Sequence, residues 1–203
     1  MVGMGERVFQ RWDFHQRLQH VLLMLAVTLL IVTGMPLRFP DAGISHFLMA
    51  LIGGASRAGV LHRFSAVVLV VCSGYHVLYT LMRLVRRDFS WSMMPQWKDV
   101  KDLWQMSMYF VGLSEFRPKF ARYTFKEKAE YWSVAWGTVI MVGTGLVMWF
   151  PVSAAKVLKS YVPLAMDVAR VVHSYEGLLA ALAIVVWHFY NAHISAEVFP
   201  MSP

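Results

Sequence analysis

Four histidines interrupt long apolar stretches of this sequence at matched spacings. His62 and His76 are 14 residues apart, and His173 and His188 are 15 residues apart. An α-helix turns by about 100° and rises by about 1.5 Å per residue. Each pair would therefore lie on one face of a helix, about 40° apart in the first pair and about 60° apart in the second, and more than ~20 Å apart along the axis. Two such helices placed together would bring imidazoles face to face at two levels.

Paired imidazoles at two levels suit iron porphyrins better than bare metal ions. Haem iron needs only two axial ligands from the protein, and imidazole is a common one. A zinc ion would need four ligands at each level, and Glu176 is the nearest carboxylate within these stretches. The chain has one cysteine, Cys72, which we expect to be a packing residue, and it lacks the CxxC and CxxCH patterns of iron–sulfur and covalent haem sites. We predict two non-covalent haems, one between His62 and His173 and one between His76 and His188.

The alternative for any one histidine is a structural hydrogen bond to a neighbouring helix. Two matched pairs at two depths are harder to explain in this way, because ionisable groups are costly in lipid. His20 is a fifth candidate ligand near the level of His76 and His188, where it competes with His76 for the inner haem or holds a third haem. We expect three further histidines to be solvated or at the membrane surface: His15, His46 and His193.

The composition indicates that the elements carrying these histidines cross a membrane. Of 203 residues, 58% are hydrophobic and 15% are charged, which is too apolar for a soluble domain of this size. Four apolar stretches, at residues 18–37, 60–82, 131–150 and 171–192, reach the roughly 20 residues needed to cross a bilayer. Backbone polar groups must be satisfied within lipid, so each stretch is helical. We predict an all-α fold, with residues 1–203 forming a single integral membrane domain, a four-helix haem-binding bundle.

The basic residues predict how this bundle is oriented. Lys and Arg number 13 before the first stretch and between the second and third, including Arg7, Arg11 and Arg17, against six on the other side, one of which is Arg63 at the start of the second stretch. The positive-inside rule then places both termini and the central loop in the cytoplasm of a multi-pass protein of the bacterial inner membrane. The net charge of +7 therefore reflects membrane topology and lipid contact, and we expect no nucleic-acid partner. Residues 90–110 carry Trp97, Lys101 and Trp104 at helical intervals, which predicts a helix on the cytoplasmic surface.

The sequence also contains a faint internal repeat. TGMPLRFP at residues 33–40 ends the first span, and TGLVMWFP at residues 144–151 ends the third, 111 positions later. His62 and His173 are separated by the same 111 positions, and His76 and His188 by 112. The chain is therefore predicted to consist of two related helical hairpins, each with a histidine-bearing second helix. Convergent endings of two spans are the simpler explanation of the eight-residue match.

Several segments together resemble a known superfamily. RLQHVLLMLAVTLLIVTGMPLRFP, LHRF, EKAEYWSVAWGTVIMVGTGLVMWFP and HSYEGLLAALAIVVWHFYNAH look like the di-haem cytochrome b subunits of membrane-bound formate dehydrogenases and nickel–iron hydrogenases, over residues 11–193. That resemblance implies ligands at His20, His62 and His173, with a fourth near His188, and it pairs His20 with His188. The extra His76 and the 14- and 15-residue spacings look instead like the cytochrome b of quinol-oxidising complexes, in which both haems lie between the second and fourth helices. The outer haem is the same in both cases. For the inner one we favour His76 over His20 as the partner of His188.

The resemblance implies a b-type cytochrome that carries electrons across the bilayer. Electrons would pass between a quinone or menaquinone pool and a periplasmic redox partner subunit, either an iron–sulfur metalloenzyme or a multihaem cytochrome c. The quinone is expected beside residues 122–132, where Lys126, Glu127 and Glu130 are candidate proton carriers. The redox chemistry would belong to haem, so no catalytic side chain is predicted. The alternatives are a stand-alone quinol oxidoreductase with a small diffusible acceptor, and a non-redox membrane transporter or assembly protein.

Overall fold

The computed structural model describes residues 12–195, and the regular structure in this range is helical, with no strand. This confirms the predicted all-α class. Arg7 and Arg11, which the charge argument uses, lie outside the described residues. The elements in chain order are α1 (Phe14–Arg38), α2 (Gly43–Ile52), α3 (Ala55–Val85), η1 (Trp91–Met93), α4 (Trp97–Phe110), α5 (Phe125–Trp149), α6 (Pro151–Leu158), η2 (Lys159–Tyr161), α7 (Val162–Leu182), η3 (Ala183–His188) and η4 (Tyr190–Ile194).

Within the described range, four helices are long and apolar enough to cross a membrane. They are Phe14–Arg38, Ala55–Val85, Phe125–Trp149 and Val162–Ile194, with mean hydropathies between 1.4 and 2.2. Each overlaps one predicted stretch and begins before it, and the last reaches 33 residues; the third ends at Trp149, one residue before the predicted end. The sequence prediction stopped each span at the first polar residues, whereas a helix continues through them into the headgroup region.

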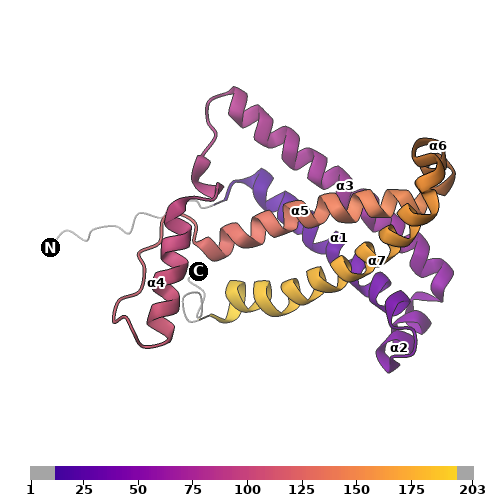
Figure 1. Cartoon of the computed structure of the whole chain (residues 1–203), viewed down its shortest axis with the longest axis horizontal. Helices are drawn as coiled ribbons and strands as arrows, with labels where there is room; N and C mark the ends of the chain where they lie inside the picture. Colours follow the sequence, from indigo (N-terminus) through magenta and orange to yellow (C-terminus); the bar gives the residue numbers. More distant parts are fainter. Residues whose placement is uncertain (1–11, 196–203) are drawn as a thin grey trace. The chain divides into compact units, whose positions relative to one another are not determined.

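The chain divides into two compact units, Met1–Arg87 (unit 1) and Asp88–Pro203 (unit 2). In unit 1, the long helix α1 packs against α3 and the short helix α2 connects them. In unit 2, α5 packs against α7 and α6 connects them. The order long, short, long can be followed in the indigo-to-magenta and the orange-to-yellow parts of Figure 1. Each unit is therefore a helical hairpin, as the internal repeat predicted.

The first long helix of each unit begins with the same capping arrangement. Asp13 Oδ1 accepts from the backbone N–H of Gln16 at 2.9 Å, and the Gln16 side chain accepts from the Asp13 backbone at 3.1 Å. Thr124 and Glu127 form the equivalent capping box on α5, with distances of 3.3 and 2.8 Å. These boxes satisfy backbone N–H groups that the first turn leaves without partners. The two boxes are 111 positions apart, so the repeat reaches the start of both hairpins.

The same two helices also end alike. Phe39 follows α1 with φ −121° and ψ 65°, and Phe150 follows α5 with φ −120° and ψ 62°. Each phenylalanine precedes a proline, Pro40 or Pro151, whose ring disfavours the α conformation in the residue before it. Because the caps and the ends both recur at the same offset, a duplicated hairpin explains the sequence match better than convergent endings.

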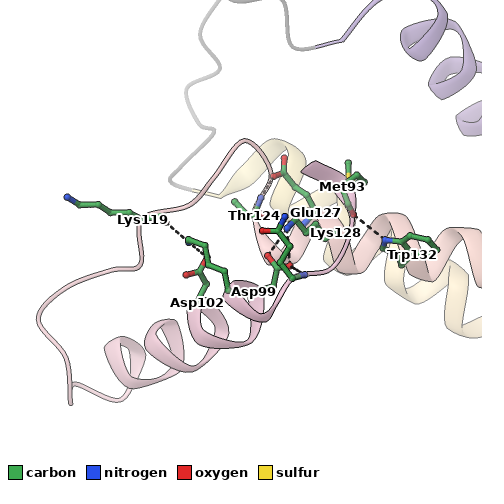
Figure 2. A network of polar contacts seen from close by, with 10 residues as sticks. Met93, Asp99, Asp102, Lys119, Thr124, Glu127, Lys128 and Trp132 are labelled. Carbon is green, nitrogen blue, oxygen red and sulfur yellow. Dashed lines mark hydrogen bonds and ion pairs between the residues drawn. The ribbon is translucent and has the colours of Figure 1, made fainter. Parts of the chain in front are cut away.

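Helix α4 of unit 2 is held against the start of α5 by polar contacts (Figure 2). Lys128 on α5 is buried, and its Nζ lies 2.9 Å from both carboxylate oxygens of Asp99 on α4. The indole N–H of Trp132 donates to the Met93 carbonyl at 3.2 Å. A buried charge is stable only when it is paired in this way, so this ion pair fixes where α4 starts.

The other face of α4 is apolar and exposed. Trp97 is 72% exposed and Trp104 is 68% exposed, while Asp102 and Met106 are buried. A helix that turns aromatic side chains outward and a polar face inward suits the boundary between headgroups and acyl chains. The predicted surface helix is thus present in the structure, and its exposed aromatic side chains agree with that location.

Candidate functional site

In each unit, the first histidine of the second long helix is bonded to a threonine of the first. His62 Nδ1 lies 2.9 Å from Thr33 Oγ1, and His173 Nδ1 lies 2.9 Å from Thr144 Oγ1. A threonine hydroxyl has one proton, and each gives it to a carbonyl four residues earlier on its own helix, at 2.6 and 2.7 Å. Each oxygen therefore accepts from the histidine Nδ1–H. This tautomer carries its basic lone pair on Nε2, the atom that would ligate a metal.

A glycine follows each of these threonines and leaves room for the imidazole. A Cβ atom at Gly34 would lie 3.2 Å from Cε1 of His62, and one at Gly145 would lie 3.4 Å from Cε1 of His173. The Cβ atom would press against the ring at Gly34 and would just touch it at Gly145. The repeated Thr-Gly pair therefore has two roles, since the threonine fixes the tautomer and the glycine lets the ring lie close to the neighbouring helix.

The second histidine of each helix is also bonded through Nδ1. His76 Nδ1 lies 2.8 Å from Oε1 of Gln19, and His188 Nδ1 lies 2.9 Å from Oε2 of Glu130. An amide oxygen and a carboxylate oxygen both accept, so both histidines again carry the proton on Nδ1. Gln19 and Glu130 are 111 positions apart. All four imidazoles are therefore held by repeat-related residues in one tautomer.

A π-helix accounts for the one-residue difference in histidine spacing. The 14 residues from His62 to His76 lie in regular α-helix. If the 15 residues from His173 to His188 were also regular α-helix, the rotation between the two histidines would be about 100° larger than in α3. The last five steps instead lie in the π-helix η3. A π-helical residue turns by about 82° rather than about 100°, so the total rotation is about 1,410°, close to the ~1,400° of α3. His188 thus returns to the face that His76 has on its own helix.

The structure places the remaining histidines as follows. His20 follows Gln19 on α1, and its ring lies edge-on to Trp12 with centroids 5.1 Å apart. His15 Nδ1 lies 2.6 Å from the hydroxyl of Tyr75. His46 lies on α2, and His193 lies in η4 with its ring 5.1 Å from that of Phe189. His20 and His76 belong to the same unit, so both stay candidates for the inner haem.

The segment expected beside a quinone is largely occupied by structural contacts. Glu127 completes the cap of α5, and Lys128 pairs with Asp99. Glu130 holds His188. Two of the three expected proton carriers, Glu127 and Glu130, therefore have other roles in the structure.

Sequence reasoning missed the residues that hold the histidines. Thr33, Thr144 and Gln19 were not among the predicted site residues, and Glu130 was predicted only as a proton carrier, although all four lie in the repeat at the 111-residue offset. A search of the repeat for polar residues facing the second helix would have found them. Their contacts fit the ligand set of a b haem, which takes neutral imidazole that ligates through Nε2 and has a partner on Nδ1. Within residues 12–195, no group of three or more His, Cys, Asp or Glu side chains could hold a bare metal ion.

Two comparisons with known proteins bear on this arrangement. The model of the family described as prokaryotic cytochrome b561 matches residues 11–198. The cytochrome b556(fdo) subunit of formate dehydrogenase from Escherichia coli strain K12 is 24% identical over 181 residues, which cover 83% of this chain and 78% of the relative. The corresponding subunits of the O6:H1 and O157:H7 strains match with the same identity and coverage.

Proposed function

Because the chain belongs to the prokaryotic cytochrome b561 family, we propose that it carries electrons through two b haems between a quinone pool and a periplasmic redox partner. Part of this description follows from the family itself. The protein is a multi-pass membrane cytochrome of the b type that works in electron transfer, and haem b is its cofactor. We propose five further features: the number of haems, their ligands, the quinone, the redox partner and the location in the inner membrane. The single observation that carries it is that four histidines each bond through Nδ1 to a residue of the neighbouring helix. We call these four partner residues the anchors: Thr33, Gln19, Thr144 and Glu130.

We assign the outer haem to His62 and His173, and the inner haem to His76 and His188. The assignment is supported by the Nδ1 bond that every one of the four histidines makes to a repeat-related residue, and by the π-helix that keeps His188 on the matching face. It requires that α3 and α7 face each other, so that residues 1–203 form one membrane domain around the two haems. His20 remains the alternative partner of His188, or the ligand of a third haem.

The protein's part in this function is to bind and orient. A bound haem supplies one-electron chemistry at its iron. The Nδ1 anchors fix ring orientation and raise the basicity of the ligating nitrogen. The apolar helices around the histidines keep water away from the electron path.

The partner is proposed from the relative and from the small size of the connections. The similar protein of E. coli is the cytochrome subunit of a formate dehydrogenase. We propose that this chain likewise serves a redox subunit in the periplasm, either an iron–sulfur metalloenzyme or a multihaem cytochrome c. A stand-alone quinol oxidoreductase with a diffusible acceptor is the rival, and co-purification of a second subunit from native membranes separates the two. A transporter or assembly protein would yield a colourless preparation.

The proposal is tested by the haem-to-protein ratio and the reduced visible spectrum of the purified protein. Wild type should hold two low-spin b haems. His62→Ala and His173→Ala should each lose one haem, leaving the same spectral species, and His76→Ala should lose the other. His20→Ala and the control His46→Ala should keep both, because neither side chain is assigned as a ligand. Two haems in His76→Ala and one in His20→Ala would reverse the inner pairing, and wild type without haem would reject the function.

A further inference from the structure

A pocket of about 250 Å³ lies at one end of unit 1, where α1 begins and α3 ends. None of its side chains belongs to the proposed haem ligands or their anchors. It is lined by His15, Tyr75, Tyr79, Met82, Arg83 and Arg86.

Two polar contacts shape the pocket walls. His15 Nδ1 lies 2.6 Å from the Tyr75 hydroxyl, which joins the start of α1 to α3. The Tyr79 hydroxyl donates to Asp13, and the Arg83 guanidinium lies 3.8 Å from the same carboxylate. The pocket therefore has one wall with an imidazole and a phenol, and another in which a phenol and a cation are held by one carboxylate.

Asp13 stabilises this second wall as a charged group. Burial would raise the pKa of its carboxyl, but hydrogen bonds from Tyr79 and the Gln16 backbone, with the charge of Arg83, hold the pKa below its ordinary value. Asp13 is therefore ionised at neutral pH and acts as a counter-charge.

The internal repeat shows that the pocket is an addition to the duplicated hairpin. Caps, anchors and histidine ligands recur in both units. The positions equivalent to His15, Tyr75 and Tyr79 hold Lys126, Trp187 and Asn191 in unit 2. Packing of the hairpin does not require these three side chains, because the second copy forms the same helices without them.

The pocket adjoins a proposed haem ligand. Tyr75 immediately precedes His76, and Tyr79 follows it by three residues, one helical turn. A small molecule held against both tyrosines would lie within one turn of His76. The positive-inside argument puts this end of α3 on the cytoplasmic side.

We propose that this pocket binds the ring of a quinol, and that His15 and Tyr75 contact one of its oxygens. The aromatic rings of the tyrosines and the Met82 side chain give a flat apolar surface, and the phenols and the imidazole provide hydrogen bonds at its edge. The volume suits a ring, with the hydrocarbon tail in the lipid. A phosphate headgroup is less suited, because Asp13 pairs with Arg83 and leaves Arg86 as the other guanidinium of the lining. The inference rests on the proposed function and names the quinone site in unit 1 in place of residues 122–132.

The reaction at this site balances with the groups present. Oxidation of a quinol breaks two O–H bonds and yields a quinone, two protons and two electrons. Both protons leave to cytoplasmic water, which reaches the pocket beside the exposed His15 side chain. A haem held by the proposed ligand His76 would take up the two electrons one at a time. Reduction of a quinone is the same sequence in reverse.

The test follows haem reduction by menadiol in the purified, haem-loaded full chain, using rapid mixing. Tyr75→Phe and His15→Asn should each slow the reduction by about tenfold or more, the effect of one lost hydrogen bond. Their haem content and dithionite-reduced spectra should match wild type. Tyr75→Phe keeps the ring and therefore the packing. Tyr190→Phe, a phenol of unit 2, is the matched control and should reduce at the wild-type rate.

The other outcomes overturn the inference in distinguishable ways. Wild-type rates in both pocket variants, together with a slow Lys126→Gln variant, would place the quinol at residues 122–132 and leave the proposed function intact. Wild-type rates with loss of co-purified phosphatidylglycerol would make the pocket a lipid headgroup site. Absence of haem from wild type would overturn the proposed function, and this inference with it.

Discussion

Single side chains set the properties of each proposed ligand through the group that accepts its Nδ1 proton. The outer histidines, His62 and His173, donate to neutral hydroxyls. The inner histidines differ from each other, because His76 donates to an amide and His188 to a carboxylate. A carboxylate makes the imidazole a stronger electron donor than an amide does, and so favours ferric over ferrous iron. The two haems are therefore expected to have different midpoint potentials, with the inner one lowered by Glu130.

Substituting the hydrogen-bond partners of the inner histidines, Glu130 and Gln19, tests the expected difference in midpoint potential. Glu130→Gln should raise the midpoint potential of one haem by about 40 mV, since a charged and a neutral hydrogen bond differ by about 1 kcal/mol and 59 mV corresponds to about 1.4 kcal/mol for one electron. Gln19→Glu should lower the potential of the same haem. Spectroelectrochemical titration of the purified protein measures both, with the other haem as internal reference. Unchanged potentials in both variants would show that these side chains do not act through ligands.

At the scale of the helices, the rotation per residue determines which histidines lie on the same face. Residues 183–194 of the fourth long helix lie largely in π-helix, whereas α3 is α-helical from Ala55 to Val85. An inserted residue would turn the rest of a regular helix by about 100°. The π segment takes up the extra residue between His173 and His188. Such insertions are frequent at functional sites, and here the insertion preserves the face that carries both histidines.

If the π-helix has this role, a one-residue deletion in η3 and a one-residue insertion in α3 should have opposite effects on haem binding. Deleting Val185 should turn η3 into α-helix with a 14-residue spacing, so both haems should remain. Inserting one alanine between Leu69 and Val70 should rotate His76 by about 100° and remove one haem. Haem-to-protein ratios of the two purified proteins give the answer. Loss of a haem in the deletion, or two haems in the insertion, would contradict the role assigned to the π-helix.

At the scale of the molecule, the duplicated hairpin gives each unit a long helix with two anchored histidines. The proposal that each haem takes one ligand from each unit rests on this duplication. The family match and the formate dehydrogenase relative confirm the superfamily that the sequence segments resemble. The duplication also explains why the pocket residues of unit 1 can differ from the equivalent residues of unit 2, while the caps and anchors of the two units are alike.

The predicted topology can be tested with single cysteines. The sole native cysteine, Cys72, is 5% exposed, so wild type should not react with a membrane-impermeant maleimide. Glu115→Cys lies in the connection between α4 and α5 and should be labelled only in inverted inner-membrane vesicles. Asp41→Cys lies between α1 and α2 and should be labelled only in spheroplasts. The reverse pattern would invert the assigned orientation and move the pocket to the periplasmic side.

The sequence by itself determined the class of the protein, its four spans, the histidine spacing and the repeat. These follow from local properties, since hydropathy and helical periodicity depend only on neighbouring residues. Only the tertiary structure decided which polar residue holds each histidine, that a π-helix corrects the spacing of the last pair, and that His15 meets Tyr75 in a pocket. Gln19 and His76 are 57 positions apart, and no local pattern links them. Contacts of this kind arise from the packing of one helix on another, which depends on the whole hairpin.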